Sequence, residues 1–157
     1  MIEKLIIYDS RGGTTRGVAN KVSKELDVKS VDCVDILEGR YELPENRKYV
    51  LITYTDKIGE LPIKTKEFLK GYSEGLKAVV GNGSSDFKKM GMFGKAGEII
   101  SNMFEVPLLY KLDRGGSTQD IVNISNKVSG VLELGKNVEL KEKKSYQLGT
   151  MMTLTRA

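Results

Sequence analysis

The chain has 157 residues, a formal net charge of +4 and a pI near 9.0, and its length suits one domain with its own core. It contains no histidine and one cysteine, Cys33, which excludes histidine-assisted nucleophilic catalysis, most transition-metal sites and an internal disulfide. No stretch approaches the roughly 20 apolar residues of a membrane span, and the first residues turn polar too early for a signal peptide, so we expect a cytoplasmic protein that binds no membrane.

Strand-like apolar runs alternate with helix-like apolar stripes along the chain. Strands are expected at residues 5–8, 30–35, 49–54, 76–80 and 106–112. Helices are indicated between or after them by apolar residues about one turn apart: Val18, Val22 and Leu26; Ile63, Phe68 and Tyr72; Ala96, Ile99, Ile100 and Met103; Ile121, Ile124, Val128 and Leu132. We interpret all of these stripes as core, and Cys33 as a buried thiol within a strand.

The order of these elements predicts a three-layer α/β fold, because strands that are apolar at consecutive positions are typical of a parallel sheet covered on both faces. The polar segment 35–47 is expected to connect two strands directly. We assign residues 1–132 to one domain and residues 133–157 to a C-terminal extension of unknown structure. Within that extension, Lys141–Lys144 forms a basic cluster that we interpret as part of a solvated tail.

Loops rich in glycine and hydroxyl groups follow the first, third and fourth predicted strands. Ligands of parallel α/β sheets bind outside the carboxyl ends of the strands, so these loops should share one edge. The first loop precedes a helix, and its glycines, hydroxyls and helix N-terminal amides suit a phosphate. The other two add aromatic and aliphatic walls, which suit a flat heteroaromatic ring. A mononucleotide with a planar ring, FMN, therefore fits.

The loops give the candidate FMN-binding residues. We expect no catalytic side chain and no metal ligand, because a flavin would carry the chemistry. The candidates are Ser10, Arg11, Gly12, Gly13, Thr14, Thr15, Thr53, Tyr54, Thr55, Ile58, Gly59, Gly81, Asn82, Gly83, Ser84 and Phe87.

Several short motifs also occur in a fixed order. They are Tyr8-Asp9-Ser10 with Gly13, Leu51–Thr55 followed by Gly59, Pro62 and Glu67-Phe68-Leu69, Gly81-Asn82 ahead of Phe87, Phe93–Gly97, Glu105-Val106-Pro107, and Gly116-Ser117 with Asp120. In this order the chain resembles the NrdI family, the flavodoxin-like activating proteins of class Ib ribonucleotide reductase, from about Leu5 to Val128. Ordinary flavodoxins share the first loop but not the later series.

The resemblance implies a flavodoxin-like sandwich with a five-stranded parallel sheet in the order 2-1-3-4-5, and it adds Gly116 to the candidate FMN-binding residues. Members bind FMN without a covalent bond and act as redox accessory proteins. Their reduced flavin reacts with O2, and the oxidant, taken to be superoxide, reaches the dimanganese site of the reductase small subunit. There it assists tyrosyl-radical formation for deoxyribonucleotide synthesis. The implied partners are that subunit, O2 and an unidentified electron donor such as a flavodoxin reductase.

The chain also departs from these patterns. Gly12 stands where flavodoxin-type loops usually carry a hydroxyl residue, the loop around Gly83–Met90 is longer than in the family, and Arg114 stands where the family usually has an apolar residue. The segment from Gly130 to Ala157 has no recognised counterpart in the family. Other readings of the sequence stay open. The nearest is an ordinary electron-transfer flavodoxin. A receiver-type signalling domain would place Asp9, Asp56 and Lys111 near strand ends, but it needs clustered carboxylates for Mg²⁺. A nucleic-acid-binding module is disfavoured because basic and aromatic residues are not interleaved.

Overall fold

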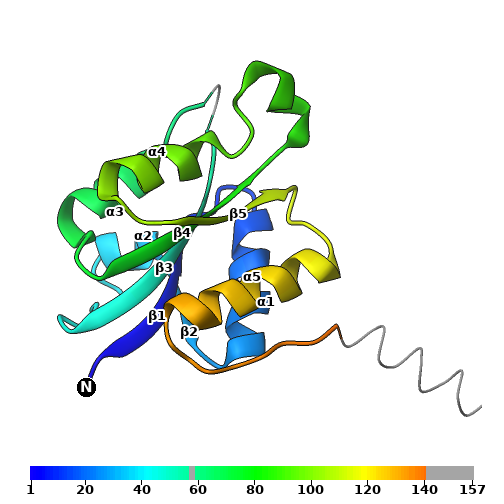
Figure 1. The fold of residues 1–157 in the computed structure, drawn as a ribbon. Helices are drawn as coiled ribbons and strands as arrows, with labels where there is room; N and C mark the ends of the chain where they lie inside the picture. Colours follow the sequence, from blue (N-terminus) through cyan, green and yellow to red (C-terminus); the bar gives the residue numbers. More distant parts are fainter. Residues whose placement is uncertain (57–58, 141–157) are drawn as a thin grey trace, which may run out of the picture.

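A parallel sheet forms the middle layer of the computed structural model, which describes residues 1–56 and 59–140 (Figure 1). Its strand order is β2-β1-β3-β4-β5, and every neighbouring pair is parallel. The predicted flavodoxin-like fold and strand order are therefore confirmed. The strands are β1 (Glu3–Tyr8), β2 (Lys29–Asp32), β3 (Arg47–Tyr54), β4 (Leu76–Gly83) and β5 (Leu108–Asp113).

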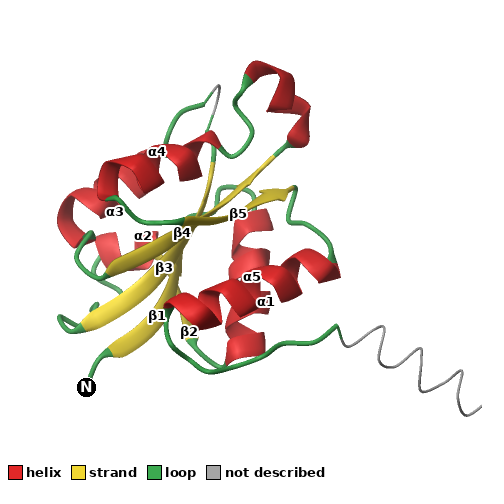
Figure 2. Cartoon of the chain, viewed as in Figure 1, coloured by secondary structure: helices red, strands yellow, loops and turns green. Residues whose placement is uncertain are grey.

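Helices cover both faces of the sheet (Figure 2). The helices α1 and α5 pack against each other on one face, and α2, α3 and α4 lie on the other. Across residues 1–56 and 59–140, no helix combines the length and the apolar character needed to cross a membrane. The bounds are α1 (Thr14–Leu26), α2 (Cys33–Leu37), α3 (Ile63–Tyr72), the 3-10 helix η1 (Ser85–Met90), α4 (Lys95–Phe104) and α5 (Thr118–Val131).

The central strands are apolar at consecutive positions because both faces of the sheet are covered. In β1, Ile6 and Tyr8 join the core beneath α1 and α5, whereas Leu5 and Ile7 join the core beneath α2, α3 and α4. Burying a leucine or isoleucine side chain contributes roughly 1.5–3 kcal/mol, so such a strand stabilises two cores at once. This rigid sheet holds the strand ends at which the loops begin.

Some predicted boundaries were wrong. The second strand ends at Asp32, and Cys33 is the first residue of α2 rather than a strand residue, although it is buried as expected. The Asp32 carboxylate accepts a 3.0 Å hydrogen bond from the Val34 amide and caps this short helix. The second and third strands are therefore not directly connected. At the other end of the sheet, β5 begins at Leu108 rather than at residue 106.

Three residues of the predicted apolar stripes are not core, and one of them, Ile99, is partly buried. Ile63, at the start of α3, is 66% exposed, and Met103, near the end of α4, is 64% exposed. Ile63 and Met103 both lie near a helix end. The other interior residues of the same stripes are buried, with Phe68 and Ile100 fully enclosed.

Residues 133–140 return along α5 and pack against the end of the domain. Val138 belongs to the core beneath α1 and α5, and its backbone exchanges hydrogen bonds with the Asn126 side chain at 2.7 and 3.1 Å. Lys136 reaches the carbonyl of Leu26 at the end of α1. The boundary after residue 132 stays a prediction, and the Lys141–Lys144 cluster lies outside the described residues.

Candidate functional site

A cleft of about 320 Å³ opens at the carboxyl ends of the strands, where the chain continues from the neighbouring strands β1 and β3 to helices on opposite faces of the sheet. This is the position at which open α/β sheets bind ligands, and the volume lies within the range of small-molecule sites. Residues from the ends of β1, β3, β4 and β5 meet there. The lining residues are Arg11, Gly12, Thr14, Thr15, Tyr54, Thr55, Asn82, Gly83 and Arg114.

The first loop leaves the N-terminus of α1 open towards this cleft. Ser10 Oγ accepts a 3.1 Å hydrogen bond from the Gly13 amide, which folds the loop back on itself. Gly13 precedes the helix at φ 92°, a conformation that a residue with a Cβ seldom adopts, and no side chain caps the helix in the described part of the chain. The first-turn amides and the hydroxyls of Thr14 and Thr15 therefore provide neutral donors for an anion.

A buried hydrogen-bond network joins this loop to the other side of the cleft. Asn82, near the end of β4, donates from Nδ2 to Thr15 Oγ1 at 3.3 Å and accepts from the Gly115 amide at 2.9 Å. One amide side chain thus fixes the start of α1 and the turn after β5 relative to β4. Asn82 is buried and lines the cleft, so it is both a structural tie and a wall residue.

Two ion pairs cross the rims of the cleft. At one rim, Arg11 binds Asp56 at 2.7 Å, and its guanidinium lies 5.5 Å from the centre of the Tyr54 ring. At the other rim, Arg114 binds Asp86. Each pair joins neighbouring loops, so the cleft is bordered by paired charges on both sides.

A smaller hollow of about 140 Å³ adjoins the cleft and shares Thr55 and Gly83 with it. Ser84, Phe87 and Met92 complete its lining, so this end is more apolar than the α1 end. Thr55 Oγ1 accepts a 3.1 Å hydrogen bond from the Ala96 amide at the start of α4. The combined space has hydroxyls and amides at one end and apolar walls at the other. This arrangement suits a ligand that carries a phosphate at one end and a planar ring at the other.

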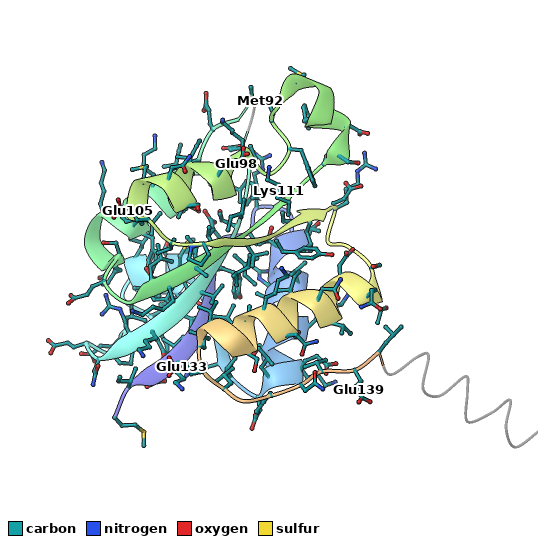
Figure 3. The ribbon with its side chains drawn as sticks, viewed as in Figure 1. Met92, Glu98, Glu105, Lys111, Glu133 and Glu139 are labelled. Carbon is teal, nitrogen blue, oxygen red and sulfur yellow. The ribbon has the colours of Figure 1, made fainter. Side chains whose placement is uncertain are left out.

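Close packing fixes α4 beside this hollow. Gly97 lies so near the sheet that an added Cβ would come within 2.7 Å of the Leu108 side chain on β5, with the Gly81 Cα of β4 at 3.5 Å. The Lys111 side chain runs across Gly94 and pairs with Glu98 at 3.1 Å, as can be followed in Figure 3. Met92, labelled in the same figure, lies against Gly59.

Ten of the candidate residues line the cleft or the hollow, and the other candidates within residues 1–56 and 59–140 do not. Thr53 is fully buried, and its hydroxyl lies 2.8 Å from that of Thr65 on the α2–α4 side. Gly116 lies against the Asp120 side chain of the α5 capping box. Gly81 packs against Gly94 and Gly97 at the start of α4. Ile58 lies outside the described residues.

Two lining residues were missed by the sequence reasoning: Arg114 and Met92. Arg114 directly follows β5, so the rule that ligands bind outside strand ends could have found it. Met92 follows no strand, and nothing local in the sequence places it beside Gly59. The loop predicted at residues 81–87 also differs, because Gly81, Asn82 and Gly83 continue β4 and pair with β5.

Asp9 is a buried carboxylate just below the first loop. It is 3% exposed, and its Oδ2 accepts a 2.7 Å hydrogen bond from Thr65 Oγ1. Burial, the largest cause, raises the pKa of Asp9 above its ordinary value of 3.8, with smaller contributions from Asp32 and Asp56 against the opposing hydrogen bond from Thr65. Ionising Asp9 therefore costs folding free energy.

We expect the free energy of unfolding of Asp9→Asn to rise relative to that of the wild type as pH rises. Because the folded-state pKa is above the unfolded one, the wild type loses stability as pH rises from near 3.8 through the folded pKa, and the amide does not titrate. Urea unfolding between about pH 4 and about pH 8 measures the difference.

Asp120→Asn is the matched control with the opposite sign. The hydrogen bond from Tyr110, with others from Ser117, lowers the pKa of Asp120. Replacing the Asp120 carboxylate by an amide should therefore lower the free energy of unfolding at pH values above the unfolded pKa. This loss should become smaller as pH falls. A pH-independent difference for Asp9→Asn would show that ionisation of Asp9 does not control stability.

Sequence comparisons identify relatives over most of the chain. The protein-family model described as NrdI Flavodoxin like matches residues 6–126. Protein NrdI of Macrococcus caseolyticus is 32% identical over 129 residues, covering 82% of this chain and 92% of the relative. Protein NrdI of Deinococcus radiodurans is 31% identical over 115 residues, covering 73% and 75%. The SPbeta prophage-derived protein NrdI of Bacillus subtilis is 27% identical over 121 residues, covering 77% and 88%.

Solved structures with a similar fold are flavodoxins. A short-chain flavodoxin associated with a bacterial microcompartment has a TM-score of 0.69 at 18% identity, covering 87% of this chain and 100% of that one. Oxidised flavodoxin 1 of Bacillus cereus has a TM-score of 0.63 at 20% identity, covering 83% and 97%. Flavodoxin of Fusobacterium nucleatum, solved with bound flavin mononucleotide, has a TM-score of 0.51 at 16% identity, covering 93% and 99%. At these identities the likeness is one of fold.

Proposed function

Because this chain belongs to the NrdI flavodoxin-like family, we propose that it binds FMN and serves a class Ib ribonucleotide reductase as a redox accessory protein. When bound and reduced, FMN would supply electrons to O2, giving superoxide as the oxidant for the dimanganese site of the reductase small subunit. The observation that carries the FMN proposal is the cleft at the strand ends, with neutral donors at one end and an apolar hollow at the other.

The residues present fit the two ends of FMN. Gly12, Thr14 and Thr15 surround the uncapped N-terminus of α1, and they would hold the phosphate through backbone amides and hydroxyls. Phe87 and Met92 line the hollow that would receive part of the ring and exclude water from it. The Tyr54 ring also lines the cleft, and the Arg11 guanidinium lies 5.5 Å from the centre of that ring.

The visible spectrum of the purified protein tests the cofactor. We expect a yellow protein that releases FMN on denaturation, or a colourless one that quenches FMN fluorescence on titration. Riboflavin, which lacks the phosphate, should bind more weakly, because it leaves the α1 end of the cleft empty. Failure of both flavins to bind would refute the FMN proposal.

Binding to the partner separates this proposal from an ordinary electron-transfer flavodoxin. We expect the FMN-loaded protein to form a complex with a purified class Ib small subunit, measured by calorimetry or analytical ultracentrifugation. An ordinary flavodoxin loaded with FMN is the matched control, since it shares the fold and the cofactor. Equal binding of the two, or no complex under reducing conditions, would favour the electron-carrier alternative.

A further inference from the structure

The outer wall of the smaller hollow is a short excursion of the chain between β4 and α4. We call residues 84–90 the η1 segment; it contains Ser84 and the 3-10 helix Ser85–Met90. Ser84 and Phe87 of this segment line the hollow, and Phe87 is itself 40% exposed. The segment projects beyond the sheet edge in Figure 1, so its attachment to the body of the protein decides the shape of the hollow.

The end of β5 provides that attachment. The Asp113 carboxylate accepts hydrogen bonds from the Ser85 amide at 2.9 Å and from the Ser85 hydroxyl at 2.7 Å. The Arg114 guanidinium donates to Ser84 Oγ at 3.1 Å and pairs with Asp86. Two consecutive residues therefore hold three consecutive residues of the η1 segment.

The backbone of Arg114 is fixed in a conformation that suits this role. Arg114 has φ 51°, in the left-handed region that non-glycine residues adopt at a cost in free energy. Its amide donates to the Gly83 carbonyl at 2.6 Å, and the next amide, that of Gly115, donates to Asn82. These bonds hold Arg114 beside both spaces, because it lines the cleft while its guanidinium binds the η1 segment.

We propose that Arg114, together with Asp113, is a positioning residue that clamps the η1 segment against the end of β5 and thereby slows the release of the flavin ring. The proposal rests on the proposed FMN function. Arg114 acts through Ser84 and Asp86 on the wall formed by Phe87, and it needs no contact with the phosphate. Its effect should therefore be the same for flavins with and without a phosphate group.

Stopped-flow measurements of FMN and riboflavin release test whether Arg114 acts on the ring wall and not on the phosphate. Arg114→Ala removes the guanidinium but keeps a Cβ, so the left-handed backbone cost remains. Both flavins should leave roughly two- to fivefold faster, the size expected for one exposed ion pair with its hydrogen bonds. Arg114→Lys keeps the positive charge, so its flavin release rates should lie between those of Arg114→Ala and the wild type. Arg40→Ala is the matched control, since Arg40 is an exposed, ion-paired arginine in the turn that follows α2.

Hydrogen exchange of the flavin-free protein gives a second readout. Amides 85–92 should exchange faster in Arg114→Ala and in Asp86→Asn, and the double variant should add little to the larger single effect. If Arg114→Ala changed neither the flavin release rates nor the amide exchange rates, the clamp would be overturned. If this variant released FMN more slowly, or if only FMN and not riboflavin left faster, the proposed action through the wall at Phe87 would be overturned. Failure of the wild type to bind either flavin would instead refute the FMN function, while the exchange rates would still decide whether the clamp exists.

Discussion

Replacing Asn82 by aspartate should weaken FMN binding by about ten- to a hundredfold. The substitution keeps the shape of the side chain, and one oxygen can still accept from the Gly115 amide. The donor to Thr15 is lost, however, and a negative charge enters the wall of the cleft beside Gly12 and Thr15. The Thr15 hydroxyl would then donate to the new carboxylate instead of to a phosphate, and repulsion between the carboxylate and the phosphate adds to the loss of FMN affinity. Fluorescence titration with FMN measures the change.

Riboflavin tests whether this loss of affinity acts through the phosphate. Its affinity should fall less than that of FMN, because it brings no phosphate to the α1 end of the cleft. Asn20→Asp is the matched control: Asn20 is exposed on α1 and does not line the cleft, so the substitution adds the same charge away from the proposed phosphate position. If Asn82→Asp left FMN affinity unchanged, the phosphate would not lie at this end.

Gly75→Ala should lower the free energy of unfolding by about 2–4 kcal/mol. Gly75, in the turn before β4, has φ 92°, and an added Cβ would lie 2.5 Å from the Arg47 carbonyl oxygen. That oxygen belongs to the backbone of β3, so it cannot rotate away. The Gly75 carbonyl also accepts a 2.9 Å hydrogen bond from the Tyr49 amide, and a shift of the turn would disturb this bond.

Gly39→Ala is the control that isolates the steric part of this effect. Gly39 has a similar φ of 77°, but nothing lies within 4 Å of the added Cβ. It should therefore show only the conformational cost of the left-handed region, about 1 kcal/mol. Denaturant unfolding of both variants provides the comparison. Equal losses would mean that the turn at Gly75 moves away from Arg47 without cost.

The architecture was predictable because the strongest signals in the sequence are repeated in every element. The interiors of β1 and β3 are apolar without interruption, and α1 and α5 carry regular apolar stripes. The end of β4 was not predictable in this way. Gly81 and Gly83 favour turns by local propensity, but pairing with Lys111 and Asp113 of β5 and close packing against α4 keep them in the strand.

Within the candidate site, too, some residues could be predicted from their neighbours in the sequence and others depend on partners far away in the sequence. Residues that directly follow strands, such as Arg11, Gly12 and Thr55, could be found from the sequence and line the cleft. Thr53 lies one residue before the end of β3, and the alternation of a strand turns its side chain to Thr65. The roles of Asn82 and Arg114 depend on partners about 30 or more positions away, which no local pattern reveals.

The paired arginines around the cleft have a consequence for how a ligand is selected. Arg11 and Arg114 each bind an aspartate, namely Asp56 and Asp86. A rim of matched charges exerts little attraction at a distance, in spite of the basic composition of the chain. An arriving anion would thus gain its binding energy only on contact, from amides and hydroxyls whose positions are fixed by the fold. The cleft would discriminate among anions by geometry, and highly charged polyanions would gain no advantage at its entrance.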